Sequence, residues 1–200
     1  MQKQDLRVVK TNRQIDQALL RLLTQMPFSK IKVEQLCREA MINRSTFYAY
    51  YQDKYDLMDK YLGRVMGEFE AQVDVAFVTA SPQRVGDPAY RQSFDKVLRF
   101  MAQHREEYLA LWGLSLSCNV FGEMVDIVGR NILAQLDTRA MDASQQEYAR
   151  LYARLFASDM MTLVRWWMEY ENIQMEQVQK IMADNMSHGM FQTFRNYVGG

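Results

Sequence analysis

The stretch VEQLCREAMINRSTFYAYYQDKYDLM, residues 33–58, contains two short helical patterns separated by a turn. In its first part, apolar residues recur at spacings of three and four, which is typical of the buried side of a helix: Val33, Leu36, Cys37 and Ala40. The second part places Phe47, Tyr50 and Tyr51 on one side of a helix. The turn AMIN, residues 40–43, joins them, so the sequence predicts a helix-turn-helix over about residues 33–52.

One aromatic residue of this stretch, Tyr48, does not belong to the apolar side of the second helix. Tyr48 is turned by about 100° from Phe47 around the helix, so it lies away from the centre of the apolar side. Arg44 and Ser45 lie beside it, and such residues at a helix N-terminus suit a helix that enters the major groove of DNA. Two interpretations remain open. The Tyr48 hydroxyl binds a DNA phosphate, or its ring lies half-buried against Tyr55 or the first helix.

The whole chain has the composition of a globular protein, with 48% apolar and 24% charged residues among 200. Its net charge is zero, but residues 1–64 carry 12 Lys and Arg against 7 Asp and Glu, whereas residues 65–200 carry 12 against 17. A polyanion would be attracted to the first part and repelled by the second. Since such a split also arises by chance, it supports nucleic-acid binding without establishing it.

Several classes of protein are not expected. The longest uncharged run, residues 108–122, is too short to span a membrane, and residues 1–10 do not have the pattern of a signal peptide. Only two cysteines are present, so a cytoplasmic location is expected. His104 and His188 stand in no metal-binding spacing, and no glycine-rich phosphate loop is found. We expect neither an enzyme nor a metal or cofactor, and no membrane partner.

Helical periodicity extends over most of the chain. An apolar stripe over residues 15–26 predicts a first helix, with Thr11 as its N-cap and Pro27 at its end. Asp53 is expected to open a helix that runs to about Val78, followed by a loop over residues 79–90.

Five more helices are expected at residues 90–103, 105–117, 119–136, 145–170 and 174–196. Ser144 and Glu147 have the spacing of a capping box at the start of the fourth of these. The chain shows no strand alternation, so the sequence predicts an all-α protein of about nine helices.

Residues 33–58 resemble the helix-turn-helix of the TetR family of transcriptional regulators. The family pattern is a short helix ending in Glu-Ala, a turn, then Thr-Phe-Tyr, an aromatic pair and Asp-Lys-x-x-Leu. The residues that match it are Glu39, Ala40, Arg44, Thr46, Phe47, Tyr48, Tyr51, Lys54 and Leu57. The resemblance covers about 50 N-terminal residues, and the remainder matches only in helical layout and length. It implies a three-helix DNA-binding domain, residues 1–60, and a helical ligand-binding and dimerisation domain, residues 61–200.

The resemblance also implies how double-stranded DNA is bound. Tyr48 and Lys54 would hold backbone phosphates, Lys54 from the first turn of the fourth helix. Arg44, Ser45 and Thr46 would face base edges or phosphates. The full set of implied DNA-contacting residues is Lys10, Thr11, Lys32, Arg44, Ser45, Thr46, Tyr48, Tyr50 and Lys54.

Two residues depart from the family pattern. The turn glycine after Glu-Ala is Met41, so the turn is expected to form without easy access to positive φ. The usual small or hydroxyl cap before the first short helix is Lys32, which loses the cap but adds a charge that can contact a phosphate.

The resemblance further implies a homodimer formed by the last two helices. Residues 145–170 carry apolar side chains over more than one narrow stripe, as in a helix that packs on its own core and on a partner. Burial within one subunit is the alternative. The implied interface residues are Tyr152, Phe156, Trp166, Trp167, Met182, Met186, Gly189 and Met190.

A small-molecule effector, apolar or aromatic, is implied as well. Candidate pocket residues are Phe100, Tyr108, Trp112, Phe121, Met124, Asp159 and Met160, and Asp159 or Glu123 would pair with a cationic group. The same residues would also serve as ordinary core. The function expected is therefore a ligand-responsive repressor that binds a near-palindromic operator as a dimer. The alternative is a protein-interaction module of the same fold, or an activator, controlled by a protein partner.

Overall fold

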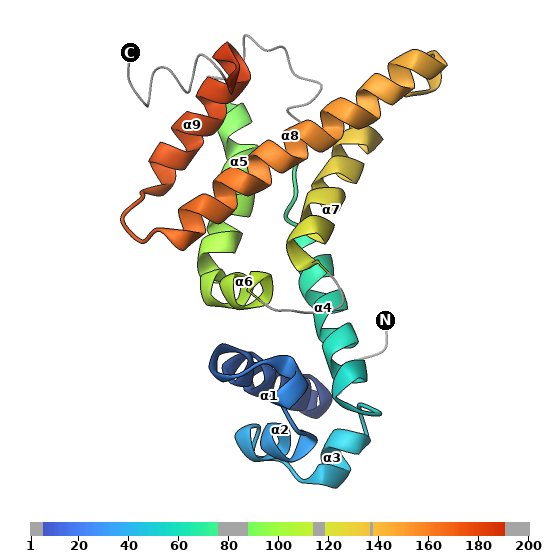
Figure 1. The fold of residues 1–200 in the computed structure, drawn as a ribbon, viewed down its shortest axis with the longest axis vertical. Helices are drawn as coiled ribbons and strands as arrows, with labels where there is room; N and C mark the ends of the chain where they lie inside the picture. Colours follow the sequence, from blue (N-terminus) through green and yellow to red (C-terminus); the bar gives the residue numbers. More distant parts are fainter. Residues whose placement is uncertain (1–5, 76–87, 114–118, 137, 191–200) are drawn as a thin grey trace. The chain divides into compact units, whose positions relative to one another are not determined.

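The structure, a computed structural model, describes residues 6–75, 88–113, 119–136 and 138–190 (Figure 1). Within these ranges it contains nine α-helices, two short 3-10 helices and no strand, which confirms the all-α prediction. The chain forms two compact units, one of residues 1–67 and 106–119 and one of residues 68–105 and 120–200. The domain boundary expected after residue 60 stays a prediction.

The first unit contains most of six helical elements. They are α1 (Leu6–Gln25), the 3-10 helix η1 (Phe28–Lys30), α2 (Val33–Glu39), α3 (Arg44–Tyr48), α4 (Lys54–Glu70) and α6 (Arg105–Trp112). The predicted stripe of α1 is buried, with Ile15, Ala18 and Leu19 at 0% exposure. The predicted cap Thr11 is wrong, because the helix begins at Leu6 and Thr11 lies inside it.

The start of α4 is as predicted, whereas its end is not. The Asp53 carboxylate accepts the N–H groups of Tyr55 and Asp56 at 2.8 and 2.9 Å and so caps the helix. The helix ends at Glu70 instead of Val78. Its C-terminus passes into turn bonds of the i+3 type, and the next residues, VDV at 73–75, are poor helix formers.

A buried hydrogen bond joins α4 to α6 within the first unit. The Tyr61 hydroxyl donates to the Glu107 carboxylate at 2.5 Å, and the Tyr61 side chain is 3% exposed. Burial, and then the neighbouring carboxylate, raise the pKa of Tyr61 far above its ordinary value. The folded protein therefore holds this proton more tightly than the unfolded chain does.

Tyr61→Phe removes this bond and keeps the ring. We expect it to lower the free energy of unfolding by about 1–2 kcal/mol, because a buried bond to a charged acceptor is lost. Wild-type stability should fall as pH rises above about 10, where the unfolded tyrosine ionises, and the variant should lack this component. Urea unfolding measures both effects. Tyr55→Phe, at a ring 58% exposed, is the matched control and should change little. Equal stability of the two variants would contradict the role of Tyr61.

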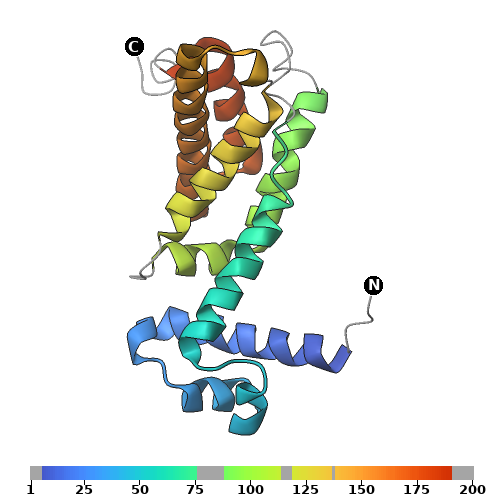
Figure 2. The same cartoon turned by 90° about the vertical axis from the view of Figure 1, so that its right-hand side faces the viewer.

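The second unit is built from four α-helices and a short 3-10 helix. They are α5 (Pro88–Gln103), α7 (Val120–Gln135), the 3-10 helix η4 (Thr138–Ala140), α8 (Ala143–Glu169) and α9 (Met175–His188). Helix α8 packs on α7 and on α9, and α9 packs on α5 (Figure 2). At the contact between α7 and α8, a Cβ added to Gly129 would lie 3.8 Å from the Ala153 carbonyl and 3.9 Å from the Ala157 Cβ. Small residues thus allow these two helices to approach closely.

The ends of α8 and α9 differ from the prediction. The capping box of α8 is formed by Asp142 and Gln145, with bonds of 2.8 and 2.9 Å, instead of Ser144 and Glu147. Helix α9 ends at His188 and is followed by Gly189, whose φ of 80° suits glycine. The continuation expected to residue 196 lies outside the described residues, as does most of the expected loop at 79–90.

Candidate nucleic-acid interface

Backbone hydrogen bonds hold the turn between α2 and α3. The Met41 N–H donates to the Arg38 carbonyl at 3.2 Å, and the Ile42 N–H donates to the Cys37 carbonyl at 2.9 Å. This pair of bonds is a Schellman motif, which ends a helix through one residue in the left-handed conformation. Here that residue is Met41, with φ of 55°.

The expectation for this turn is therefore corrected. Met41 adopts the positive φ that the family's glycine would provide, although a side chain with a Cβ makes this conformation unfavourable by about 1–2 kcal/mol. The side chain is 91% exposed, so little packing restricts it. The helix-turn-helix thus keeps its turn at the expense of local strain.

An open groove of about 630 Å³ lies beside α3 and the N-terminal part of α1. Its lining residues come from α1, the turn, α3 and the two residues after α3, and they are Val8, Thr11, Met41, Ile42, Asn43, Ser45, Thr46, Ala49 and Tyr50. Thr11, Ser45, Thr46 and Tyr50 belong to the predicted DNA contacts, so the structure brings four of those residues around one groove. Of these, Ser45 is exposed, and Thr11, Thr46 and Tyr50 are partly exposed.

Arg44 and Tyr48 form a pair on α3. The Arg44 guanidinium donates to the Glu34 carboxylate at 2.9 Å. Its hydrogen bond with the Tyr48 hydroxyl, and then the charge of Glu34, raise the pKa of Arg44. The Tyr48 side chain is 50% exposed, and its ring packs edge-on against Phe47 of its own helix. The ring of Tyr55 instead packs on Phe28, so the exposed interpretation of Tyr48 fits this arrangement better than packing on Tyr55.

Lys10 and Lys32 are exposed, as an electrostatic contact with a phosphate requires. Lys32 stands at the N-cap of α2, where its backbone N–H donates to the Gln35 side chain at 2.8 Å. Its ammonium group is not needed for that bond. The DNA contacts of both residues stay predictions.

Lys54 has partners within the chain that the family resemblance did not imply. Its ammonium group donates to the carbonyls of Phe28, Ser29 and Ile31 at 3.0, 2.9 and 2.8 Å. It also lies 5.0 Å from the centre of the Phe28 ring. These bonds use the three donors of a lysine ammonium. Lys54 therefore holds η1 against the start of α4, and its phosphate contact stays a prediction.

A second group of residues positions α3, and it could not be found from sequence. The Tyr51 hydroxyl donates to the Asn12 side chain at 3.4 Å, and Tyr51 also bonds to Arg64. Arg64 in turn pairs with Asp16 of α1. Burial is the largest single influence on the pKa of Arg64 and lowers it, but the hydrogen bonds and charges of Asp16 and Tyr51 together outweigh burial and raise the pKa. Since Tyr51 closely follows α3, this network ties the end of that helix to α1 and α4.

A solved structure of a known protein matches nearly the whole chain. The structure of the dihydroxyacetone kinase operon activator DhaS, a TetR-family regulator, covers 93% of this chain and 95% of its own, with a TM-score of 0.50 and 14% sequence identity. This chain has the TetR-type fold. The likeness shows the fold, as residues 33–58 led us to expect. No family model and no curated protein matches the sequence.

In the TetR-type fold seen here, the predicted pocket residues fall into both units. Tyr108 and Trp112 belong to the first unit, where their rings lie 6.0 Å apart. The others belong to the second unit: Phe100, Phe121, Met124, Asp159 and Met160. Tyr108 is 1% exposed and Met124 is 0% exposed, as for core residues. Whether any of them touches a ligand stays a prediction.

Asp159 has a partner within the chain. The Asn185 amide donates to its carboxylate oxygens at 3.2 and 3.4 Å. Burial raises the pKa of Asp159, and the bond from Asn185 opposes that rise. A cation paired with Asp159 would therefore share the carboxylate with an amide.

A small apolar cavity lies in the second unit, with a volume of about 20 Å³. Met160 lines it together with Phe69, Val128, Val164 and Met182. This volume holds about one water molecule, whereas sites for small molecules measure about 300–1,000 Å³. This part of the core is filled, so the cavity is not the predicted effector site.

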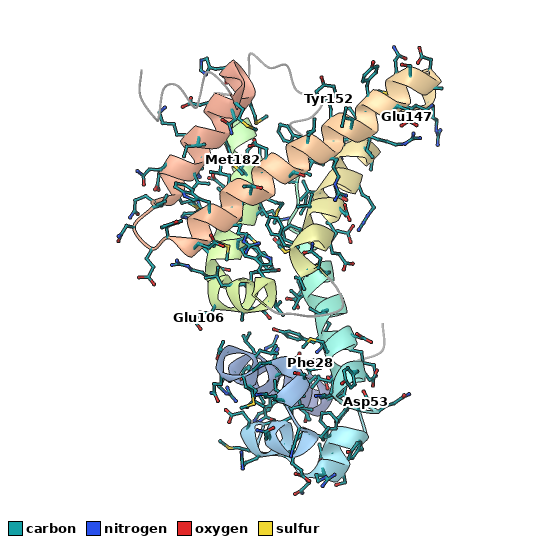
Figure 3. All side chains as sticks on the ribbon, viewed as in Figure 1. Phe28, Asp53, Glu106, Glu147, Tyr152 and Met182 are labelled. Atoms are coloured by element: carbon teal, nitrogen blue, oxygen red, sulfur yellow. The ribbon has the colours of Figure 1, made fainter. Side chains whose placement is uncertain are left out.

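The predicted dimer residues lie partly on the surface and partly in the core. Tyr152, Trp166 and Met190 are 66%, 38% and 60% exposed, and the Tyr152 ring stands in solvent on α8 (Figure 3). Met182 is 3% exposed in its own unit. Phe156, Trp167 and Met186 are partly exposed, and the Trp167 indole donates to the Ile173 carbonyl at 2.9 Å. Gly189 caps α9.

Sequence reasoning missed part of an outward stripe on α8. Its large exposed side chains are Tyr148, Leu151, Tyr152, Leu155, Trp166 and Tyr170. At 3.6 residues per turn, all six project from one side of the helix, because they are separated by three or four residues or by whole turns. We call this set the α8 stripe. The spacing is visible in the sequence, but burial is needed to tell this side from the core side.

Further features of the described residues bear on other kinds of site. No helix in these ranges has the length and apolar character needed to cross a membrane. The same ranges place no three His, Cys, Asp or Glu residues together in a way that would hold a metal ion. Cys37 is buried, as its place on the inner side of α2 predicts, and burial raises the pKa of its thiol.

Proposed function

We propose that this protein is a sequence-specific DNA-binding transcriptional regulator. The observation that carries this proposal is the helix-turn-helix of α2 and α3, which exposes Arg44 and Ser45 and lines a groove with Thr46. Short polar and basic side chains on one exposed helix are those that read base edges in a major groove. The excess of basic residues in residues 1–64 would draw DNA to this unit.

A homodimer would place two such helices on one DNA duplex. The α8 stripe supports this step, since six large apolar side chains on one exposed helix side are typical of an interface. A symmetric dimer binds half-sites one helical turn apart, about 34–36 Å, so the operator would be nearly palindromic. A regulator bound over a promoter in this way acts most often as a repressor.

Selection of bound sites from random DNA by the purified protein tests the proposal. We expect an enriched, nearly palindromic sequence that the protein binds at physiological salt. Binding without enrichment, and only at low salt, would mean non-specific contact with phosphates and would overturn the proposal. The enriched sequence then serves as the operator probe for variants of the protein.

Arg44→Ala tests direct readout. We expect affinity for the selected operator to fall about tenfold or more, since a bidentate arginine–base contact contributes about 1–3 kcal/mol. Repeating the selection with the variant should relax the preference at one position of each half-site. Arg99→Ala is the matched control, because Arg99 is also exposed and also pairs with an acid, Asp95. Equal loss with both variants, or no loss with Arg44→Ala, would contradict a base contact.

Two forms of control are compatible with this fold. In the first, a small apolar or aromatic effector alters the affinity for DNA, as the family resemblance implies. In the second, a protein partner controls the regulator, or the chain acts as an interaction module.

The two forms differ in a simple measurement. Thermal denaturation of the protein with a panel of apolar, aromatic and cationic compounds should reveal a stabilising effector, because a ligand that binds only the folded state raises Tm. A hit that also releases the operator supports control by a small molecule. Stabilisation by no compound in the panel supports control by a protein.

A further inference from the structure

Met41 makes the folded protein less stable than it needs to be. Its φ of 55° lies in the left-handed region, where glycine and asparagine are favoured and residues with larger side chains are strained. Strained residues of this kind are concentrated at functional sites, so an observed outlier motivates a hypothesis of function. The strain at Met41 therefore points to a role for its side chain outside the folded core.

Packing does not compensate for this strain. The Met41 side chain is 91% exposed, the most exposed of the large apolar residues that the structure describes, whereas the next residue, Ile42, is partly buried. The backbone bonds of the turn come from N–H groups, which asparagine or glycine at position 41 would also supply. The methionine side chain therefore does not stabilise the folded state, and a less strained residue at this position would form the same turn.

The location of Met41 indicates what its side chain meets. It lines the groove along α3 together with Asn43, Ser45, Thr46 and Tyr50, on the side that the proposed function assigns to DNA. These neighbours are mostly polar, so a flexible apolar side chain among them offers a distinct kind of contact. The apolar groups that a DNA duplex presents to such a side chain are deoxyribose carbons and the thymine methyl group.

We propose that Met41 contacts an apolar group of the DNA when the protein binds its operator, and that this contact adds affinity while the turn loses stability. The proposal rests on the proposed function. Its two effects have opposite signs, which separates it from a purely structural role. Relief of the strain should stabilise the protein, and loss of the side chain should weaken binding.

Three variants test it on the full chain. Met41→Gly and Met41→Asn relieve the strain, and Met41→Leu retains an apolar side chain and the strain. We expect the first two to raise Tm by about 2–4 °C. We expect them to weaken operator binding about five- to tenfold, with an unchanged dependence on salt, because no phosphate contact is lost. Met41→Leu should keep both values near those of the wild type.

Operators with deoxyuridine in place of each thymine identify the apolar group. If it is a thymine methyl, the wild type loses affinity at one position and Met41→Gly does not. If it is a deoxyribose, the replacement affects the two proteins equally, while Met41→Gly remains the weaker binder.

Two results would overturn the inference. A Met41→Gly variant that is more stable and binds the operator as tightly as the wild type would show that the side chain does not touch DNA. A wild type that selects no operator would remove the proposed function itself, and the inference with it. The first result leaves the proposed function intact, so the two failures can be told apart.

Discussion

Lys54→Met is expected to destabilise the first unit by about 2–4 kcal/mol, because three hydrogen bonds from one charged group are lost together. The ammonium of Lys54 binds the carbonyls of Phe28, Ser29 and Ile31, which a methionine cannot do. Methionine keeps much of the length and the apolar character of the side chain, so the loss reports the charged hydrogen bonds. Unfolding in urea, followed by the tyrosine and tryptophan signals, measures it.

DNA binding by this variant distinguishes the two roles of Lys54. Measured where the variant is fully folded, its operator affinity should depend on salt as steeply as that of the wild type. Lys32→Met is the matched control, since Lys32 is exposed and its backbone bond to Gln35 survives the change. That control should leave stability unchanged and lower the salt slope by about 1. A stable Lys54→Met variant with a lower slope would mean that the ammonium leaves its carbonyls for a phosphate.

Leu155→Glu is expected to convert the proposed dimer to a monomer and to weaken operator binding by about a hundredfold or more. Leu155 is 54% exposed in the middle of the α8 stripe. In a two-fold symmetric interface one substitution acts twice, and it would bury an unpaired carboxylate in each copy. A monomer also loses the gain from binding two half-sites at once. Sedimentation and titration of the operator measure the two effects.

The folded monomer itself should survive this substitution, because the Leu155 side chain is largely in solvent. Gln92→Glu on α5 is the control, since it adds one acidic group at an exposed position outside the α8 stripe. It should leave the dimer and its DNA affinity unchanged. A Leu155→Glu variant that remains dimeric would exclude the α8 stripe as the interface.

Local patterns predicted most of the helices. The helices of residues 33–58 can be predicted from local sequence, since apolar spacing, a turn and a helix cap at Asp53 all depend on neighbours within a few positions. Where two nearby residues could each cap a helix, the prediction from sequence selected the wrong one. Ser144 and Glu147 have capping spacing, but so do Asp142 and Gln145, and the helix begins at the earlier pair. Thr11 has the chemistry of a cap, although the helix continues beyond it to Leu6.

Contacts between distant residues could not be predicted. Lys54 matches the family motif, and the three carbonyls that bind it lie over 20 residues earlier, so that only the packing of η1 against α4 brings them together. The pairs Asp16–Arg64 and Tyr61–Glu107 are likewise joined by the fold alone. Charge and hydrogen-bonding capacity can be read from a sequence, but the choice of partner cannot.

The network of Asp16, Arg64 and Tyr51 has a mechanical consequence. It joins the end of α3 to two long helices, so we expect α3 to rotate together with α1 and α4. Labels attached to α1 and α3 of one copy should therefore report the same separation with and without DNA. In the proposed dimer, the separation between labels on the two α3 helices would instead change with the state of the protein, since a change at the proposed DNA-binding surface would have to move each first unit as a whole.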